Sequence, residues 1–187
     1  MSQKPILFLD FDRTLFDTER YYLWLGEPRR ERNQALIDGV LELPDFSQFL
    51  FSDTIDFLSD VHQTHDVIIL SFVKLEYSPQ QPTLQLKKIR GAGVLPYVDD
   101  IIVTIGNKGE EAARYLREHK REGESFVFID DEPAHLKEMR TVNTKAVCIY
   151  LDRKAVSTGI PVARGMDVFT SEHVAHGLME AKLMLNR

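Results

Sequence analysis

Acidic side chains follow two apolar stretches of the sequence, at the points where each stretch stops. The run Ile6 to Leu9 leads into Asp10 and, one residue further on, Asp12. Much later in the chain, Asp130 and Asp131 follow a second apolar run. Such continuous runs are typical of parallel strands that are buried on both faces. Because ligands gather at the carboxyl ends of strands in open α/β sheets, we interpret these carboxylates as groups that carry chemistry.

A hydroxyl and an amine stand at comparable points of two other segments. Ser71 follows the apolar stretch 67–70, and Lys108 follows the stretch 101–105 at the start of an expected helix. A lysine there faces the positive end of the helix dipole, which is locally unfavourable. We therefore expect an anion close to Lys108.

The segments that must position these residues alternate between strands and helices. Apolar runs predict strands at 6–9, 67–70, 101–105, 125–129, 146–151 and, more briefly, 167–169. Helical patterns with capping and end signals lie between them. This alternation predicts parallel strands joined by right-handed crossovers, and so an α/β fold with a doubly wound, Rossmann-like parallel sheet.

One connection in this scheme is too long for a plain loop. It follows the first strand and contains Trp24 and several other aromatic residues, and Pro28, Gly39 and Pro44 divide it into short helical pieces. We expect a single domain over residues 1–187, with a small helical cap inserted at residues 18–50.

Composition restricts the class of protein. The 187 residues are 43% hydrophobic and 28% charged, which excludes wholesale disorder, and the net charge of −6 gives no strong nucleic-acid signal. The single cysteine, Cys148, has apolar neighbours that favour a buried thiol. No run approaches the roughly 18 apolar residues of a membrane span, and the N-terminus lacks a secretory signal pattern. We expect a cytoplasmic protein with no membrane partner.

Several carboxylates at one sheet edge would repel one another strongly. A hard divalent cation relieves this repulsion, and an all-oxygen ligand set with room for water favours Mg²⁺. We therefore expect Mg²⁺ as a cofactor.

The order and the types of these residues resemble the motifs of the haloacid dehalogenase (HAD) superfamily. Those motifs are Asp-x-Asp-x-Thr, a Ser or Thr, a Lys, and an acidic pair. Their counterparts in this sequence are Asp10, Asp12 and Thr14, then Ser71, then Lys108, then Asp130 and Asp131. The resemblance covers nearly the whole chain and implies a HAD-like core with the strand order 5-4-1-2-3. One departure is Arg13, where many members have Gly, which leaves the geometry of this loop open.

The resemblance also implies a role for each residue. Asp10 would be the nucleophile that forms an aspartyl-phosphate, and Asp12 would protonate the leaving oxygen and later activate water. Ser71 and Lys108 would bind the phosphoryl group. Thr14 would fix the loop that carries Asp12.

The metal ligands implied by the resemblance are all aspartates. They are the Asp10 carboxylate, the Asp12 backbone carbonyl and Asp130, with Asp131 binding through a water molecule or orienting it.

These roles imply a Mg²⁺-dependent phosphatase that hydrolyses a phosphomonoester, of the phosphatase branch with a small cap. Dehalogenases of the superfamily lack an acid two residues after the nucleophile, whereas phosphatases and phosphotransferases have one. Two alternatives stay open: a phosphotransferase or mutase of the same fold, and a non-catalytic HAD-like binding or regulatory domain. The substrate is expected to be a small phosphorylated molecule or the exposed phosphate of a macromolecule. Neither the oligomeric state nor contact between the cap and substrate follows from the sequence.

Overall fold

The computed structural model describes residues 3–75, 80–153 and 174–185. Within them lies a six-stranded sheet whose strands are β1 (Ile6–Leu9), β2 (Asp66–Phe72), β3 (Asp100–Thr104), β4 (Phe126–Asp130), β5 (Ala146–Leu151) and β6 (Val174–Ala175). The spatial order is β3-β2-β1-β4-β5-β6, and every pairing is parallel. The predicted doubly wound α/β sheet is confirmed, and the order 5-4-1-2-3 is extended by β6 at one edge.

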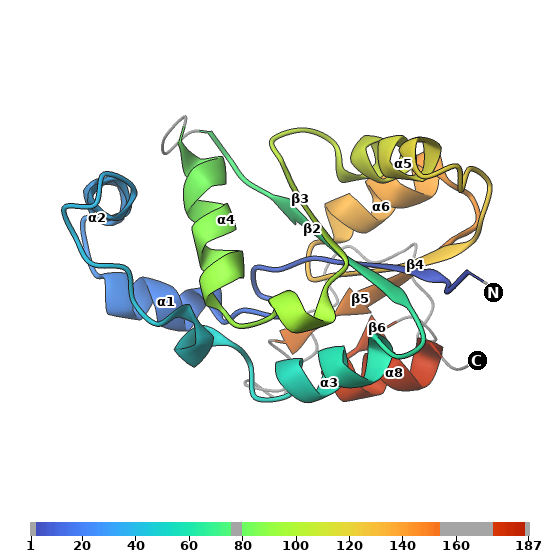
Figure 1. Cartoon of the computed structure of the whole chain (residues 1–187), viewed down its shortest axis with the longest axis horizontal. Coiled ribbons are helices and arrows are strands. Elements are labelled where there is room, and N and C mark those ends of the chain that lie inside the picture. The colour runs from blue at the N-terminus through green and yellow to red at the C-terminus, as the bar shows by residue number, and fades with distance from the viewer. Residues whose placement is uncertain (1–2, 76–79, 154–173, 186–187) are drawn as a thin grey trace.

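Helices cover both faces of this sheet (Figure 1). The α-helices are α1 (Thr18–Leu25), α2 (Arg29–Ile37), α3 (Thr54–Val61), α4 (Gln81–Gly91), α5 (Lys108–Glu118), α6 (Pro133–Val142) and α8 (Leu178–Leu185). Two short 3₁₀ helices are η1 (Phe46–Phe49) and η2 (Leu95–Tyr97). In Figure 1, α5 and α6 lie above the sheet, and α3 and α8 lie below it.

The central strand β1 is buried along its whole length, which explains its unbroken apolar sequence. Leu7 and Leu9 belong to a core cluster shared with α3, α4 and α8. Ile6 and Phe8 point to the other face, into a second cluster shared with α5 and α6. Because both faces of the strand are covered, no position in it favours a polar residue until Asp10, where the strand has ended.

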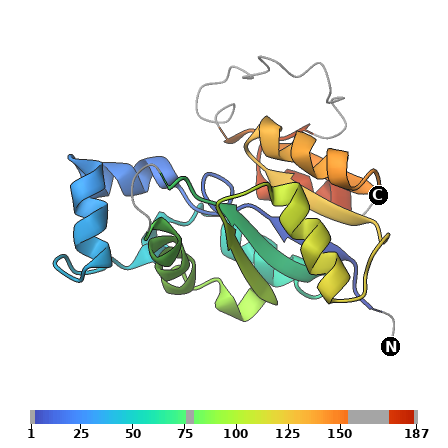
Figure 2. The same cartoon turned by 90° about the horizontal axis from the view of Figure 1, so that it is seen from above.

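The segment 18–50 carries α1, α2 and η1, and extends to one side of the sheet (Figure 2). Buried side chains tie it to the cluster under β1; they are Tyr21, Leu25, Leu36, Phe46 and Phe49. Gly91, at the end of α4, allows close packing here, since a Cβ atom on it would lie 2.8 Å from the Phe46 ring. The cap as a separate unit stays a prediction, but this segment packs continuously with the core.

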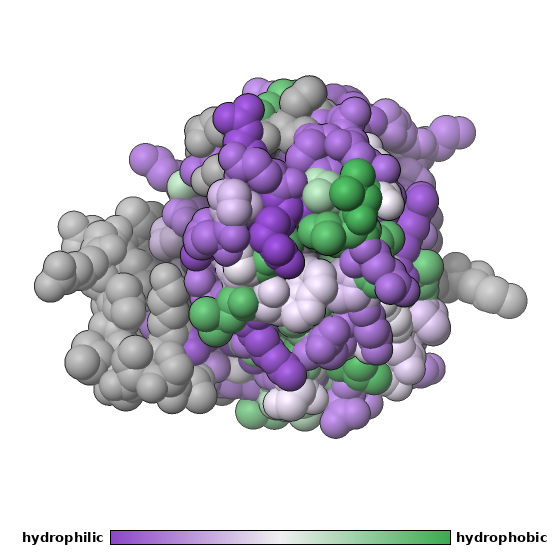
Figure 3. Space-filling model, turned by 90° about the vertical axis from the view of Figure 1, so that its left-hand side faces the viewer, coloured by the Kyte–Doolittle hydropathy of each residue, from purple (hydrophilic) through white to green (hydrophobic). Residues whose placement is uncertain are grey.

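The outer surface of this segment is largely hydrophilic, with separate hydrophobic patches (Figure 3). Its exposed large apolar side chains are Leu23, Trp24, Val40 and Leu43.

Element boundaries differ from the sequence prediction by one or two residues at the functional positions. Ser71 lies inside β2 rather than after it, Asp130 is the last residue of β4, and Lys108 is the first residue of α5. The predicted strand 167–169 lies outside the described residues. Cys148 is fully buried, as predicted. Among the helices in the described part of the chain, none is long and apolar enough to cross a membrane.

Candidate active site

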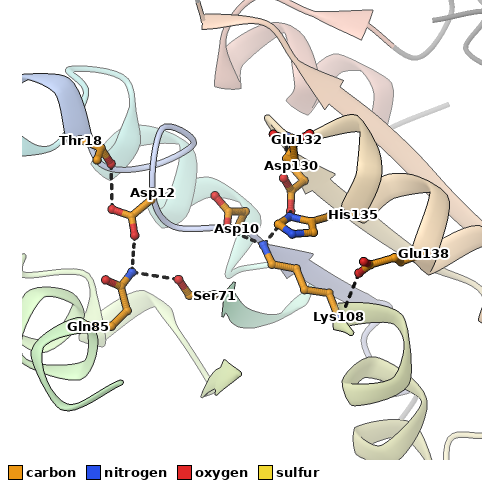
Figure 4. A network of polar contacts seen from close by, with 10 residues as sticks. All are labelled: Asp10, Asp12, Thr18, Ser71, Gln85, Lys108, Asp130, Glu132, His135 and Glu138. Atoms are coloured by element: carbon orange, nitrogen blue, oxygen red, sulfur yellow. Dashed lines mark hydrogen bonds and ion pairs between the residues drawn. The ribbon is translucent and has the colours of Figure 1, made fainter. Parts of the chain in front are cut away.

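The carboxyl ends of β1 and β4 bring together the two acidic pairs that lie far apart in the sequence. Leu9 and Ile129 are partners in the register of these neighbouring strands, and the Asp10 N–H donates to the Ile129 carbonyl at 2.9 Å. Asp10 and Asp130 therefore leave adjacent strands at the same level of the sheet. Figure 4 shows both carboxylates converging on the side chain of Lys108.

Lys108 is a fully buried cation between these two acids. Its Nζ lies 2.6 Å from Asp10 Oδ1 and 2.7 Å from Asp130 Oδ2. Burial alone would lower the pKa of Lys108, but the two carboxylates raise it overall. The negative charge that we expected near Lys108 is therefore supplied by two carboxylates. They offset the unfavourable interaction between this lysine and the dipole of α5.

Close packing of α5 against α6 places this lysine. A Cβ atom on Gly109 would lie 2.6 Å from the backbone oxygen of Glu138, so glycine permits the approach. The Lys108 N–H donates to a carboxylate oxygen of Glu138 at 3.2 Å. The Asn107 side chain caps the helix by accepting from Glu110 N–H.

The acidic cluster itself consists of Asp10, Asp130 and Asp131, each of which offers an oxygen within 4.8 Å of the others. Burial, followed by the charge of Asp130, raises the pKa of Asp10 to about 6, against the effect of Lys108. Burial and the charges of Asp10 and Asp130 raise the pKa of Asp131 to about 8. Burial also opposes ionisation of Asp130, but Lys108 and then His135 lower its pKa overall.

This donor set fits a hard divalent cation. Three carboxylates converge on one point, and Lys108 supplies only one compensating positive charge. Burial is the main cause of the raised pKa values of Asp10 and Asp131, and the neighbouring carboxylates add to it, so a cation such as Mg²⁺ bound through oxygen ligands would stabilise the ionised forms of both side chains. The predicted backbone carbonyl ligand at Asp12 stays a prediction.

Asp12 points away from this cluster, toward α1 and α4 (Figure 4). Its Oδ1 accepts from Thr18 Oγ1 at 2.8 Å and from Lys88 Nζ at 2.5 Å. Its Oδ2 accepts from Gln85 Nε2 at 2.5 Å. Burial would raise the pKa of Asp12, but Lys88 and these hydrogen bonds lower it overall.

Ser71 is linked to Asp12 through Gln85. Gln85 Nε2 donates to Ser71 Oγ at 2.9 Å as well as to Asp12. Ser71 and Lys108 are both fully buried, and neither is among the described residues that line the adjoining cavity. Phosphate binding by these two residues therefore stays a prediction. Lys108 contacts Asp10 and Asp130, and Ser71 contacts Gln85, which binds Asp12.

The cavity next to the cluster has a volume of about 520 Å³. Its polar lining includes both signs of charge: Asp10, Asp12, Asp131 and Glu132 on one hand, and Arg13, Lys74 and Lys88 on the other, together with the imidazole of His135. Tyr22 of α1 also lines it, so the inserted segment contributes to the wall. Such a mixture suits a ligand that is anionic at one end and approaches a cation bound by the acids.

Arg13 adopts a backbone conformation that glycine favours. Its φ is 61°, and its N–H donates to the Phe16 carbonyl at 2.7 Å. The side chain bonds to Glu19 at 3.1 Å, at the edge of the cavity. A left-handed φ is the physical reason that Gly suits this position. Next to it, Thr14 is buried and its carbonyl accepts from Arg153, while its hydroxyl bonds to none of the described residues.

Four contacts of the site were absent from the sequence prediction. They come from Thr18, Gln85, Lys88 and His135. A signal existed for two of them, since Gln85 and Lys88 continue the stripe of Leu84 and Ala92 along α4. Polar residues at i, i+3 within an apolar helical stripe indicate a buried polar function. His135 Nδ1 lies 3.3 Å from Asp130 Oδ2, and no pattern in the sequence distinguishes it from a surface histidine.

Comparisons with known proteins give matches at the level of structure. No protein-family model matches the chain, and no curated protein matches it. Among solved structures, a haloacid dehalogenase-like hydrolase from Burkholderia xenovorans aligns with a TM-score of 0.70 at 14% identity, covering 98% of this chain and 96% of that one. The HAD-hydrolase YfnB from Bacillus subtilis, solved bound to magnesium, aligns with a TM-score of 0.64 at 14% identity over the full length of both chains.

A third similar structure is a dehalogenase. L-2-haloacid dehalogenase from Xanthobacter autotrophicus, with chloropropionic acid covalently bound, has a TM-score of 0.61 at 13% identity, over 98% of this chain and 99% of that one. The chain therefore has the HAD-like fold, as the sequence predicted. At these identities the likeness establishes the fold alone, so the choice between hydrolysis of phosphoesters and other reactions depends on the residues of the site.

Proposed function

We propose that this protein is a Mg²⁺-dependent phosphatase that hydrolyses a phosphomonoester through an aspartyl-phosphate at Asp10. The observation that carries the proposal is the placement of Asp10. It lies at the end of β1, faces the cavity, and is bonded to Lys108 inside a cluster of carboxylates. A carboxylate supported in this way is suited to attack a phosphorus atom whose oxygens need charge neutralisation.

Charge stabilisation is the main requirement of such a reaction. Mg²⁺, when bound by Asp10, Asp130 and Asp131, would offset the negative charge of the phosphoryl oxygens. Lys108 neutralises part of the charge of Asp10 and Asp130 and keeps their side chains in place. The structure known for YfnB includes magnesium, which supports this choice of ion.

Asp12 supports phosphoester chemistry over dehalogenation. An alkoxide leaving from phosphorus needs a proton, whereas a halide leaves without one. Asp12 lines the same cavity as Asp10, and three donors hold its carboxylate at a defined place on the α1 and α4 side of that cavity. Because Lys88 and these donors lower its pKa, Asp12 is a base at rest, and the proton that it would give to the leaving oxygen is one taken from the attacking water of the preceding turnover. In the second step the same carboxylate would activate the water that hydrolyses the aspartyl-phosphate.

The cavity favours a small phosphorylated molecule. Its volume of about 520 Å³ accommodates a compact ligand, and Tyr22, Arg13 and Lys74 give a partly apolar, partly cationic wall beyond the acids. The exposed phosphate of a macromolecule is the competing substrate class.

The experiment compares phosphate release by the wild-type protein, Asp10→Asn and the control Asp100→Asn, which alters an exposed acid on the edge strand β3. Substrates are p-nitrophenyl phosphate and a panel of sugar phosphates, nucleotides and phosphopeptides. We expect hydrolysis by the wild type and Asp100→Asn in Mg²⁺, loss of it with EDTA, and background rates for Asp10→Asn.

Full activity of Asp10→Asn would show that the nucleophile is assigned wrongly. Activity that is unchanged in EDTA would remove the metal from the proposal. Phosphate that appears on an added alcohol rather than in solution would identify a phosphotransferase.

A further inference from the structure

Two polar side chains of α4 contact the carboxylate that the proposed function uses as acid and base. Lys88 Nζ lies 2.5 Å from Asp12 Oδ1 and 3.0 Å from Gln85 Oε1. Gln85 Nε2 binds the other oxygen of Asp12. We propose that Lys88 is a positioning residue that holds the Asp12 carboxylate against the leaving group of the substrate. The inference rests on the proposed function, because it assigns Lys88 a role through Asp12.

The surroundings of Lys88 leave its ammonium group little freedom. The residue is 5% exposed, and its Nζ lies over three aromatic rings, at 5.8 Å from Phe11, 4.7 Å from Phe16 and 5.3 Å from Tyr21. Cations are stabilised over aromatic faces, most of all where water is excluded. Lys88 is therefore fixed from one side by the rings and from the other by oxygen atoms.

This arrangement fixes Asp12 in turn. Lys88 and Thr18 hold its Oδ1, and Gln85 holds its Oδ2. A carboxylate bonded at both oxygens by donors from two different helices has one preferred orientation. Since general acid catalysis requires the proton within hydrogen-bond reach of the leaving oxygen, orientation is what these donors supply.

A purely structural ion pair would lie away from the cavity, and this pair does not. Lys88, Gln85 and Asp12 all line the 520 Å³ cavity, and the Asp12 side chain is 28% exposed to it or to solvent. Gln85 also bonds to Ser71, so α4 joins the acid to the hydroxyl expected to bind phosphate. The contacts of α4 thus face the place where the substrate would lie.

The neighbouring Lys87 offers a matched control. It stands on the same helix, but its Nζ donates to the Ile37 carbonyl at 3.3 Å, on the side of α2. Replacement of either lysine by methionine keeps an unbranched side chain of similar length and removes its charge.

The test measures kcat for phosphate monoesters whose leaving groups differ in pKa, from p-nitrophenol to simple alcohols. A well-placed acid matters most for poor leaving groups, since these depart only when protonated. We expect Lys88→Met to lose roughly 100-fold in kcat on alkyl phosphates, a typical share of general acid catalysis, and only a few-fold on p-nitrophenyl phosphate. Lys87→Met should match the wild type across the series.

A double variant tests whether Lys88 acts through Asp12. In an Asp12→Asn background, which lacks the acid, Lys88→Met should lower kcat no further. Lys88→Arg serves if the methionine variant does not fold, because it keeps the charge but replaces a compact ammonium by a planar group. It should show the same selective loss on alkyl phosphates, with a smaller amplitude.

The outcomes separate this inference from the proposed function. A wild-type protein that hydrolyses phosphate esters while Lys88→Met and Lys88→Arg lose equally on all leaving groups would overturn the positioning role alone. An additive loss in the Asp12→Asn background would overturn it as well. A wild-type protein inactive on every ester, with its fold verified by circular dichroism, would overturn the proposed function instead.

Discussion

Two buried lysines serve the two halves of the candidate site, and their surroundings differ. Lys108 stands between Asp10 and Asp130, with Asp131 close by, so negative charge exceeds positive charge around it. Lys88 has one carboxylate partner, Asp12, and aromatic rings on its other side. The first half has charge left over for a cation, whereas the second is balanced.

Under the proposed function, the difference explains how one cavity would provide two kinds of chemistry. Excess negative charge around Lys108 suits the binding of Mg²⁺ and, with it, a phosphoryl group. Around Lys88 the charges balance, since this lysine and the neighbouring donors keep Asp12 ionised and satisfied, so this half has no charge left over for a cation. The comparison therefore predicts that changes on the Lys108 side alter stability and metal binding, and that changes on the Lys88 side mainly alter catalysis.

The largest effect on stability is expected from Lys108→Met. It leaves two buried carboxylates without their cation, and breaking a buried ion pair in this way costs about 3–5 kcal/mol. Urea unfolding without metal measures the free energy of unfolding. Lys145→Met, which removes an exposed lysine, should stay within about 0.5 kcal/mol of the wild type. Equal stability of Lys108→Met and Lys145→Met would contradict the account of a strained acidic cluster.

A divalent cation should stabilise the folded protein by binding only to it. At a Mg²⁺ concentration 100 times the Kd, the free energy of unfolding should rise by about 2.7 kcal/mol, seen as a higher Tm. Asp131→Asn should have two effects of opposite sign: a more stable metal-free protein, because one of three crowded carboxylates is gone, and a smaller response to Mg²⁺. The control Asp100→Asn should respond as the wild type does. A full response in Asp131→Asn would exclude Asp131 from the metal site.

Lys88→Met should cost less stability than Lys108→Met. Asp12 is 28% exposed in its side chain and can be rehydrated when its partner is lost, so we expect about 1–3 kcal/mol. The same urea titration measures it, beside Lys87→Met. If Lys88→Met lowered the free energy of unfolding as much as Lys108→Met does, the proposed difference between the two halves would be wrong.

The smallest effect concerns a buried histidine at the other end of β2, outside both halves. Burial lowers the pKa of His65 below its ordinary value of 6.5. As the pH falls below 6.5, the unfolded chain binds a proton at this position before the folded protein does, so stability decreases. His65→Gln should show a shallower loss of stability between pH 7.5 and 5.5. Identical slopes in the two proteins would assign the acid sensitivity to the carboxylates of the candidate site.

The sequence predicted that the residues of the Lys108 half lie close together, for a physical reason. Strands buried on both faces give continuous apolar runs, so their ends are visible, and Asp10 and Asp130 stand at two of them. Lys108 was conspicuous because its charge opposes the dipole of α5. Parallel topology then places the ends of neighbouring strands together without any information about side chains.

The Lys88 half could not be predicted in the same way. Gln85 and Lys88 reach Asp12 across 73 and 76 residues of sequence, and their approach depends on how α4 packs against η1 and the inserted segment. Helical periodicity identifies the face of α4 but not the element opposite it. The geometry of the loop at Arg13 was left open by the sequence, because a residue other than glycine occupies its left-handed position.

The most direct test of the central claim is to trap the phosphoryl group on the protein. The wild-type protein is mixed with Mg²⁺ and a phosphomonoester that it hydrolyses, and the reaction is quenched rapidly in acid. The protein is then reduced with borohydride and digested, and the peptide that contains Asp10 is examined by mass spectrometry. We predict conversion of Asp10 to homoserine, the product of reducing an acyl phosphate, with Asp12 and Asp131 unchanged. An unmodified Asp10 during active turnover, together with hydrolysis that persists in Asp10→Asn, would contradict the account.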